Sequence, residues 1–169
     1  AVYKNGYVKN KVMEFVGPGI ANLSIEYRNA IDVMTTETTC WSSIWVTDSE
    51  TQTYYLRHGR PEAYRKLEPG QVAYYDGCVY IDLSTIECTI AMPMHPSNIY
   101  TIRELQENAA DILHLVETEA NRQIKGAKMD LMSKLRDGHI WVEQGQIAGC
   151  SAGTFENICA AADILRGRS

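Results

Sequence analysis

The amino-acid sequence predicts an α/β fold, a three-layer α/β/α arrangement with a mostly parallel sheet. The first reason is that amphipathic helical segments alternate along the chain with short apolar runs that favour β-strands, which is the pattern of α/β proteins. The second is that 45% of the 169 residues are hydrophobic, which is enough for the core of one domain or slightly more.

The first half of the chain begins with two β-rich runs. Residues 2–8 and 12–16 are expected to form hairpin-like strands, and a Gly-Pro-Gly breaker then separates them from a helix over residues 20–35. The other elements expected in this half are a loop and strand over 36–46, short helices over 49–58 and 61–67, and a strand over 78–83.

The second half starts with a connector over residues 87–98, which its prolines keep extended. Thr101 and Glu104 have the spacing of a capping box and predict the start of a helix. The elements expected after it are a helical stripe over 124–135, a strand over 140–147, and a helix that begins at Thr154 and ends at Gly167. We place a boundary in the connector, between an α/β subdomain at 1–95 and the start of a second one at 96–169.

Charge, cysteine usage and hydropathy argue against several classes of partner. A net charge of −5 argues against a nucleic acid or a membrane surface as the main partner. The five cysteines lack the even number and spacing of a disulfide framework, so we expect them reduced, as in the cytoplasm. The sequence has no signal peptide, no apolar run of about 18 residues and no CxxC or HExxH motif. Both of its ends look cut, so we expect a piece of a longer protein.

Cys150 stands between the expected strand over 140–147 and the helix that begins at Thr154. Open α/β sheets place ligand sites at the carboxyl ends of their strands, and a helix N-terminus favours a thiolate. The alternative for Cys150 is a structural small residue. A third interpretation makes Ser151 a nucleophile, because GCSAG matches G-x-S-x-G. That chemistry needs an acid and then a histidine downstream, whereas the last histidine, His139, lies upstream.

Glu37 is the second candidate residue, in the sequence TTETT between a helix and a strand. A carboxylate there is a general acid or base if it lies in a cleft, and a solvated or capping side chain otherwise. The charged residues 117–122 are expected to form a solvated helix turn, and the cysteines other than Cys150 are expected to be core thiols.

Several segments together resemble one family in order and spacing. AGCSA at 148–152, followed by FENI at 155–158, resembles the strand–cysteine–helix segment of the aconitase and isopropylmalate isomerase superfamily, written G-S-C-T-N. EFVGPG at 14–19 resembles that family's first motif, and Glu37 follows it at the family's offset. IDLS at 81–84 with IAMP at 90–93 resembles a further family stretch. The resemblance covers nearly the whole chain.

The resemblance implies a lyase, a hydratase that dehydrates and rehydrates di- or tricarboxylic hydroxy acids. Members hold a [4Fe–4S] cluster with three cysteines and leave one iron open as a Lewis acid. By motif position, Cys150 is one metal ligand, and Glu37 lies near the open iron, where it hydrogen-bonds the leaving or entering water. The remaining domains of the same protein are expected to supply a CxxC pair and a swivelling domain with the serine base and the substrate-binding arginines. The isolated chain is therefore expected to be inactive and to bind no cluster.

Two positions depart from the family pattern, since Val33 and Ala152 stand where asparagines are usual. These departures fit either a hydratase branch with another substrate or a member with weakened catalysis. The alternative function is a catalytically degenerate interaction or RNA-binding module, although the net charge of −5 speaks against strong RNA binding.

Overall fold

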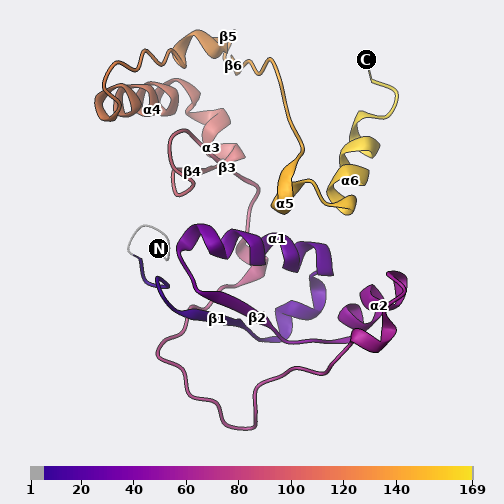
Figure 1. Ribbon diagram of the computed structural model, residues 1–169. Helices are drawn as coiled ribbons and strands as arrows, with labels where there is room; N and C mark the ends of the chain where they lie inside the picture. The colour runs from indigo at the N-terminus through magenta and orange to yellow at the C-terminus, as the bar shows by residue number, and fades with distance from the viewer. Residues whose placement is uncertain (1–5, 169) are drawn as a thin grey trace. The chain divides into compact units, whose positions relative to one another are not determined.

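The computed structural model describes residues 6–168, which combine helices with short strands (Figure 1). Contacts between residues group the chain into two compact units. Unit 1 consists of Ala1–Ile81 and Gln146–Ser169, and unit 2 consists of Asp82–Gly145. The chain therefore leaves unit 1, forms unit 2, and returns to unit 1 for its last two helices. The sequence-based division into 1–95 and 96–169 differs from these units and stays a prediction.

Unit 1 is built on a strand–helix–strand segment. Its strands are β1 (Val12–Phe15) and β2 (Ser42–Trp45), its α-helices are α1 (Ile25–Thr35), α2 (Ser49–Arg57), α5 (Gly149–Ala152) and α6 (Phe155–Leu165), and its 3-10 helices are η1 (Pro18–Asn22), η2 (Thr36–Thr38) and η3 (Pro61–Ala63). The two strands are parallel and in register from Val12 opposite Ser42 to Phe15 opposite Trp45. Parallel neighbours need a crossover connection, and α1 supplies it.

The hairpin expected at the N-terminus is wrong for the part of the chain that the structure describes. β1 pairs with β2, and residues 6–10 form turns. Residues 2–5 of the expected first strand lie outside the described residues. The rings of Phe15 and Trp45 stack with their centroids 4.2 Å apart, which explains why β1 takes this partner.

The later elements of unit 1 follow the predictions in part. α2 is confirmed, with Asp48 and Thr51 in a capping box. The helix expected over 20–35 begins only at Ile25, after η1, because Ser24 caps it by accepting a hydrogen bond from the backbone N of Tyr27 (3.3 Å). Residues 61–67 form only η3, and 78–83 form no strand. An isolated strand needs a neighbour for its backbone groups, and no described strand pairs with 78–83.

Unit 2 packs two helices against short hairpins. Its strands are β3 (Thr89–Ala91), β4 (Ile99–Thr101), β5 (Leu135–Arg136) and β6 (His139–Ile140), its α-helices are α3 (Ile102–Glu107) and α4 (Ala109–Gln123), and its 3-10 helices are η4 (Leu83–Thr85) and η5 (Met132–Lys134). The predicted capping box starts α3: Thr101 Oγ1 accepts from the backbone N of Glu104 (3.0 Å), and Glu104 Oε2 accepts from that of Thr101 (2.8 Å). The bonds that the Glu104 carboxylate accepts from the Thr101 backbone N and from the Thr101 hydroxyl lower the pKa of Glu104.

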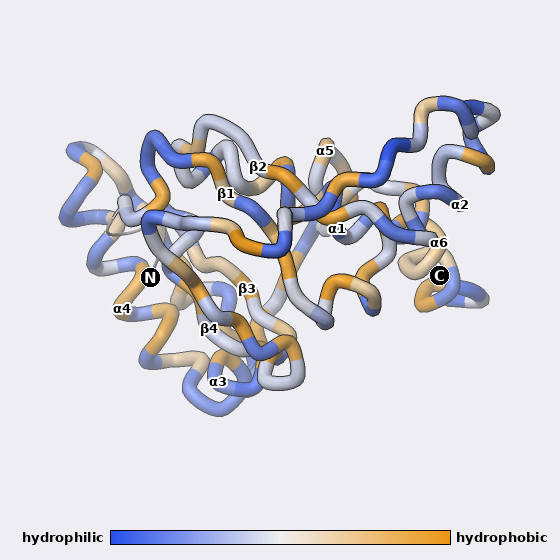
Figure 2. Tube along the Cα trace, turned by 90° about the horizontal axis from the view of Figure 1, so that it is seen from below, coloured by the Kyte–Doolittle hydropathy of each residue, from blue (hydrophilic) through white to orange (hydrophobic). Residues whose placement is uncertain are grey.

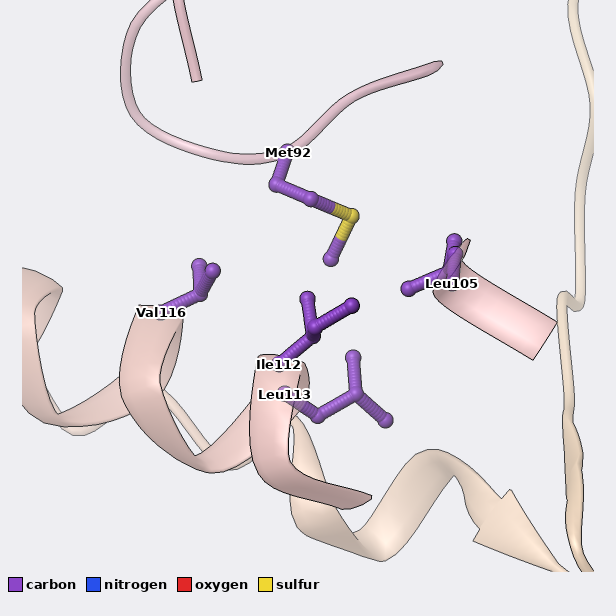
Figure 3. Packing of buried hydrophobic residues seen from close by; sticks show 5 residues of the cluster. All are labelled: Met92, Leu105, Ile112, Leu113 and Val116. Atoms are coloured by element: carbon purple, nitrogen blue, oxygen red, sulfur yellow. The ribbon is translucent and has the colours of Figure 1, made fainter. Parts of the chain in front are cut away.

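The core of unit 2 lies between α3, α4 and the residue that follows β3. Hydrophobic and hydrophilic residues alternate along α4, as the orange and blue stretches of Figure 2 show, and its apolar face is buried. Figure 3 shows five apolar side chains that point toward one another: Met92, Leu105, Ile112, Leu113 and Val116. Leu113 is only 1% exposed, so this cluster is the buried core of unit 2.

The structure refines one expectation in unit 2 and corrects three. Within the connector over 87–98, Thr89–Ala91 are extended as expected and form β3, which pairs antiparallel with β4. Residues 124–135 form no α-helix and only the short η5, because the chain turns back along α4, where Glu117 Oε2 accepts hydrogen bonds from the backbone N of Leu131 (2.6 Å) and of Met132 (3.0 Å). Glu117 is therefore a structural acceptor and not part of a merely solvated turn. The strand expected over 140–147 is reduced to β6.

The α/β class is confirmed at the level of mixed helix and strand with a small parallel sheet. The described strands form three two-stranded sheets, one parallel and two antiparallel. The three-layer arrangement with a mostly parallel sheet stays a prediction. Within residues 6–168, none of the helices combines the length and the apolar character that crossing a membrane requires.

Candidate functional site

Cys150 lies in α5, a single helical turn, and its side chain is exposed. Gly149 opens this turn with φ +84°, a conformation that residues with side chains rarely adopt. Gly153 closes it: a Cβ there would lie 2.8 Å from the carbonyl oxygen of Gly149 and 2.9 Å from the carbonyl carbon of Ala148. The turn therefore requires both glycines. The sequence predicts a strand directly before this turn, and the structure has none there. The turn does present the thiol to solvent.

The helix after this turn begins where the sequence predicts but is capped differently. Thr154 is the N-cap of α6, yet its side chain makes no capping hydrogen bond. Instead Glu26 Oε2, from the first turn of α1, accepts from the backbone N of Glu156 (2.7 Å). The Glu156 carboxylate in turn accepts from Ser24 Oγ (2.5 Å). We call these two hydrogen bonds the clasp, and they hold α6 on α1.

A small pocket of about 190 Å³ lies beside the clasp, where α5 contacts α1. Its lining residues are Glu26, Tyr27, Ala30, Ser151, Thr154, Glu156 and Asn157. No histidine is among them, so Ser151 has no neighbouring base there of the kind that the G-x-S-x-G interpretation requires. The pocket is lined by carboxylate, hydroxyl and amide groups at the edge of the turn that carries Cys150.

Glu37 lies in η2, just past the end of α1, and is exposed. Its side chain has no hydrogen bond or ion pair with other described residues. The clasp lies at the first turn of α1, an eleven-residue helix, and Glu37 lies just past its last residue; a helix rises about 1.5 Å per residue. The structure thus places Glu37 and the clasp at opposite ends of one helix. Within residues 6–168, no hydrogen bond joins Glu37 to Cys150, and the catalytic role of Glu37 stays a prediction.

The donor set of this chain fits a metal cluster only in part. Cys150 offers an exposed thiol, the ligand type that iron–sulfur clusters use. Among the described residues, no group of three His, Cys, Asp or Glu side chains is arranged to hold a metal ion. The expectation that the other four cysteines are core thiols is wrong. Cys78, Cys88 and Cys159 are exposed, and Cys40 is half-buried. The described residues therefore offer one thiol at this site.

The clasp is the part of the site that sequence reasoning missed. Glu156 belongs to a segment that resembles a family motif, but its partners Glu26 and Ser24 lie 130 and 132 residues away. A signal for Glu156 existed in its position in the first turn of a helix, where a carboxylate is favoured. No local pattern reveals that its partner is the N-cap of another helix.

Comparison of the sequence with known proteins identifies its family. The model of the aconitase family (aconitate hydratase) matches residues 1–169. The chain is 30% identical over 156 residues to the 2,3-dimethylmalate dehydratase large subunit of Eubacterium barkeri, a match that covers 92% of this chain and 30% of that protein. It is 28% identical to the 3-isopropylmalate dehydratase large subunits of Acetivibrio thermocellus and Lachnoclostridium phytofermentans, over 92% and 94% of this chain and 29% and 30% of theirs. The chain thus spans less than a third of the length of these relatives, and it belongs to the aconitase family.

Proposed function

We propose that this chain is part of an aconitase-type hydro-lyase that removes water from, and adds water to, a hydroxy acid with two or three carboxylates. Its own contribution is one cluster ligand, the Cys150 thiolate, and one proton-handling group, the Glu37 carboxylate. The observation that carries the proposal is the exposure of Cys150 on a turn that requires two glycines. A thiol held at the surface of one part of a protein is free to bind a metal centre shared with another part.

Cys150 would bind and orient a [4Fe–4S] cluster, and it would do so together with ligands from outside this chain. Three cysteine ligands leave one iron open, and one thiolate alone is insufficient to hold the cluster. When bound, such a cluster supplies a Lewis acid for the substrate hydroxyl. We therefore propose that the isolated chain binds no cluster, and that remaining domains of the same protein supply a second cysteine pair and the swivelling domain.

Glu37 would hold or release a proton for the departing or entering water. Its side chain makes no ion pair among the described residues, so its oxygens are available to a substrate water. Positioned proton transfer of this kind contributes about 10²- to 10⁴-fold to a rate. The role requires that another part of the complete protein covers η2 and excludes bulk water.

The relatives and the surface of unit 1 support the wider proposal. The relatives are named as large subunits of dehydratases of 2,3-dimethylmalate and 3-isopropylmalate, so we propose a substituted malate as substrate and a further subunit as partner. α6 has no buried residue, and its large apolar side chains Phe155 and Ile164 are 74% and 71% exposed. Such exposed apolar side chains fit burial against further protein. Exposed cysteines without disulfides fit a reducing compartment such as the cytoplasm.

The deciding experiment replaces one thiol at a time in the complete protein that contains this chain. Cys150→Ser should abolish the broad visible absorbance of the cluster after anaerobic reconstitution with iron and sulfide. Cys159→Ser is the matched control, because Cys159 is an exposed thiol of the neighbouring α6, and it should leave the absorbance intact. A full-strength cluster in Cys150→Ser would reject Cys150 as a ligand.

The degenerate interaction or RNA-binding module stays the alternative prediction, and the same preparations separate it from the hydratase. A complete wild-type protein that takes up no cluster and binds RNA would contradict the proposal. A protein that takes up the cluster and hydrates a substituted maleate would support it.

A further inference from the structure

The first turns of α1 and α6 meet in unit 1, and each supplies a carboxylate to the other through the clasp. The first N–H groups of a helix have no partner within the helix, so each needs an oxygen acceptor from elsewhere. Glu26 supplies such an acceptor to α6, and Glu156 accepts from the N-cap hydroxyl of α1. Because Thr154 makes no capping bond, Glu26 is the group that satisfies a first-turn N–H of α6.

The constraint continues from α6 to the turn that carries Cys150. Asn157, also in the first turn of α6, donates from Nδ2 to the carbonyl oxygen of Ala152 (3.0 Å). Ala152 is the last residue of α5, and the backbone N of Gly153 closes that turn onto the carbonyl oxygen of Gly149 (2.9 Å). Hydrogen bonds, linked by the backbone at 156–157 and at 152–153, therefore lead from the N-terminus of α1 to Gly149 and Ala152, the first and last residues of the turn that carries Cys150.

Few buried apolar contacts hold α5 and α6 in addition to these hydrogen bonds. α6 has no buried residue, and neither has α5. The position of the Cys150 turn relative to α1 therefore depends on the clasp and on the contact of α5 with α1. Since α1 ends next to Glu37, the same helix would also set where the thiol stands relative to that carboxylate.

We propose that Glu26 and Glu156 are positioning residues for Cys150: the clasp fixes the first turn of α6 on α1, and Asn157 passes this constraint to α5. The inference deepens the proposed function and rests on it, because the thiol needs a fixed position only if it is a ligand. The hydrogen bonds themselves are testable without any cluster.

The first test measures amide hydrogen exchange, residue by residue, in the cluster-free complete protein. Glu26→Ala should speed exchange at Glu156, which loses its acceptor, and also at Gly153, by about fivefold each, the size expected for loss of a helix cap. Glu26→Gln keeps an oxygen acceptor and should restore protection at both amides. Glu50→Ala is the matched control, because Glu50 occupies the first turn of α2, and it should leave both amides unchanged.

The outcome at Gly153 decides between two roles for the clasp. A purely local cap would alter exchange at Glu156 alone, and this result would overturn the positioning role. A drop in global stability that speeds exchange at every amide of unit 1 would overturn it as well. Glu156→Ala removes the acceptor for Ser24 and is expected to affect Gly153 as Glu26→Ala does, while Glu156→Gln should not.

The second test concerns the loaded protein. Glu26→Ala should lose its visible cluster absorbance several-fold faster than wild type when an iron chelator is added, and Glu26→Gln should behave as wild type. Unchanged bleaching in Glu26→Ala would refute the inference, even if Cys150→Ser had confirmed the ligand. Conversely, a cluster retained in Cys150→Ser would refute the proposed function while the exchange result at Gly153 stood.

Discussion

Arg28 and Asp48 form a two-point ion pair, in which Nη1 donates to Oδ1 at 3.0 Å and Nη2 donates to Oδ2 at 2.6 Å. The Arg28 side chain is only 3% exposed. Its remaining donors reach the carbonyl oxygens of Leu23 and Ile20, both at 3.0 Å. Because Asp48 also caps α2, a single cation joins η1, α1 and α2.

Arg28→Ala is expected to destabilise unit 1 by about 3 kcal/mol, since it leaves a partly buried carboxylate without its cation and two carbonyls without donors. Arg28→Lys keeps the charge but not the forked geometry, so its free energy of unfolding should lie between those of wild type and Arg28→Ala. Urea unfolding followed by tryptophan fluorescence measures both. Equal stability of Arg28→Ala and wild type would contradict the structural role of the pair.

Acid should weaken the ion pair of Arg28 and Asp48. The hydrogen bond from Arg28, aided by the backbone N–H of Thr51, holds the pKa of Asp48 below its usual 3.8. The pair therefore contributes stability above pH 3.8 that is lost as the pH falls through the lower folded-state pKa. Asp48→Asn keeps a capping side chain but not the charge, so its stability should fall less steeply below about pH 4. Urea midpoints measured across that range would test this, and parallel curves would count against it.

The core of unit 2 offers a matched pair of leucines. Leu113 is 1% exposed and Leu115, two residues along α4, is 59% exposed. Leu113→Ala is expected to cost about 3 kcal/mol because it opens a cavity in a buried core, and Leu115→Ala should cost well under 1 kcal/mol. Thermal or urea unfolding of both variants gives the comparison. Similar losses in the two would mean that α4 buries another face.

Glu37→Gln addresses the proposed chemistry and not the fold. In the complete protein it should leave the visible cluster absorbance unchanged and lower turnover by about 10²- to 10⁴-fold. Glu50→Gln, at another exposed carboxylate of unit 1, serves as the control and should keep wild-type turnover. Unaltered turnover in Glu37→Gln would make this residue a bystander.

Gly153→Ala tests the turn that presents Cys150. The new Cβ would meet backbone atoms at 2.8 and 2.9 Å, which have no free rotation that relieves the clash, so α5 must shift. We expect weakened cluster binding in the complete protein with little change in global stability. Gly70→Ala is the control, because its Cβ would meet only the Val72 carbonyl oxygen at 3.7 Å. Cluster content per protein is the measurement, and wild-type content in Gly153→Ala would contradict the requirement for glycine.

Local signals in this sequence predicted local structure well. The capping box predicted at Thr101 and Glu104 places the start of α3 correctly, because donor and acceptor lie three residues apart and fold together. The structure adds that the turn around Cys150 requires the glycines at 149 and 153. The exposure of the thiol follows from that turn.

Features that depend on distant partners were not predictable in this way. β1 was assigned to a hairpin with the preceding run, and only the stacking of Phe15 on Trp45 reveals the parallel partner. The apolar run at 78–83 has strand composition but no described strand beside it. Thr154 was expected to cap α6 with its own side chain, whereas the acceptor comes from Glu26, 130 residues earlier.

The insertion of unit 2 between the two parts of unit 1 has a consequence for biosynthesis. Ser24 leaves the ribosome long before Glu156 exists, since 132 positions of chain separate them. Closing so long a loop costs little more entropy than closing a moderate one, but contacts of high sequence separation form slowly. Unit 2, whose pairings are short in range, is therefore expected to fold first, while α1 waits on the nascent chain with its acidic first turn open to water.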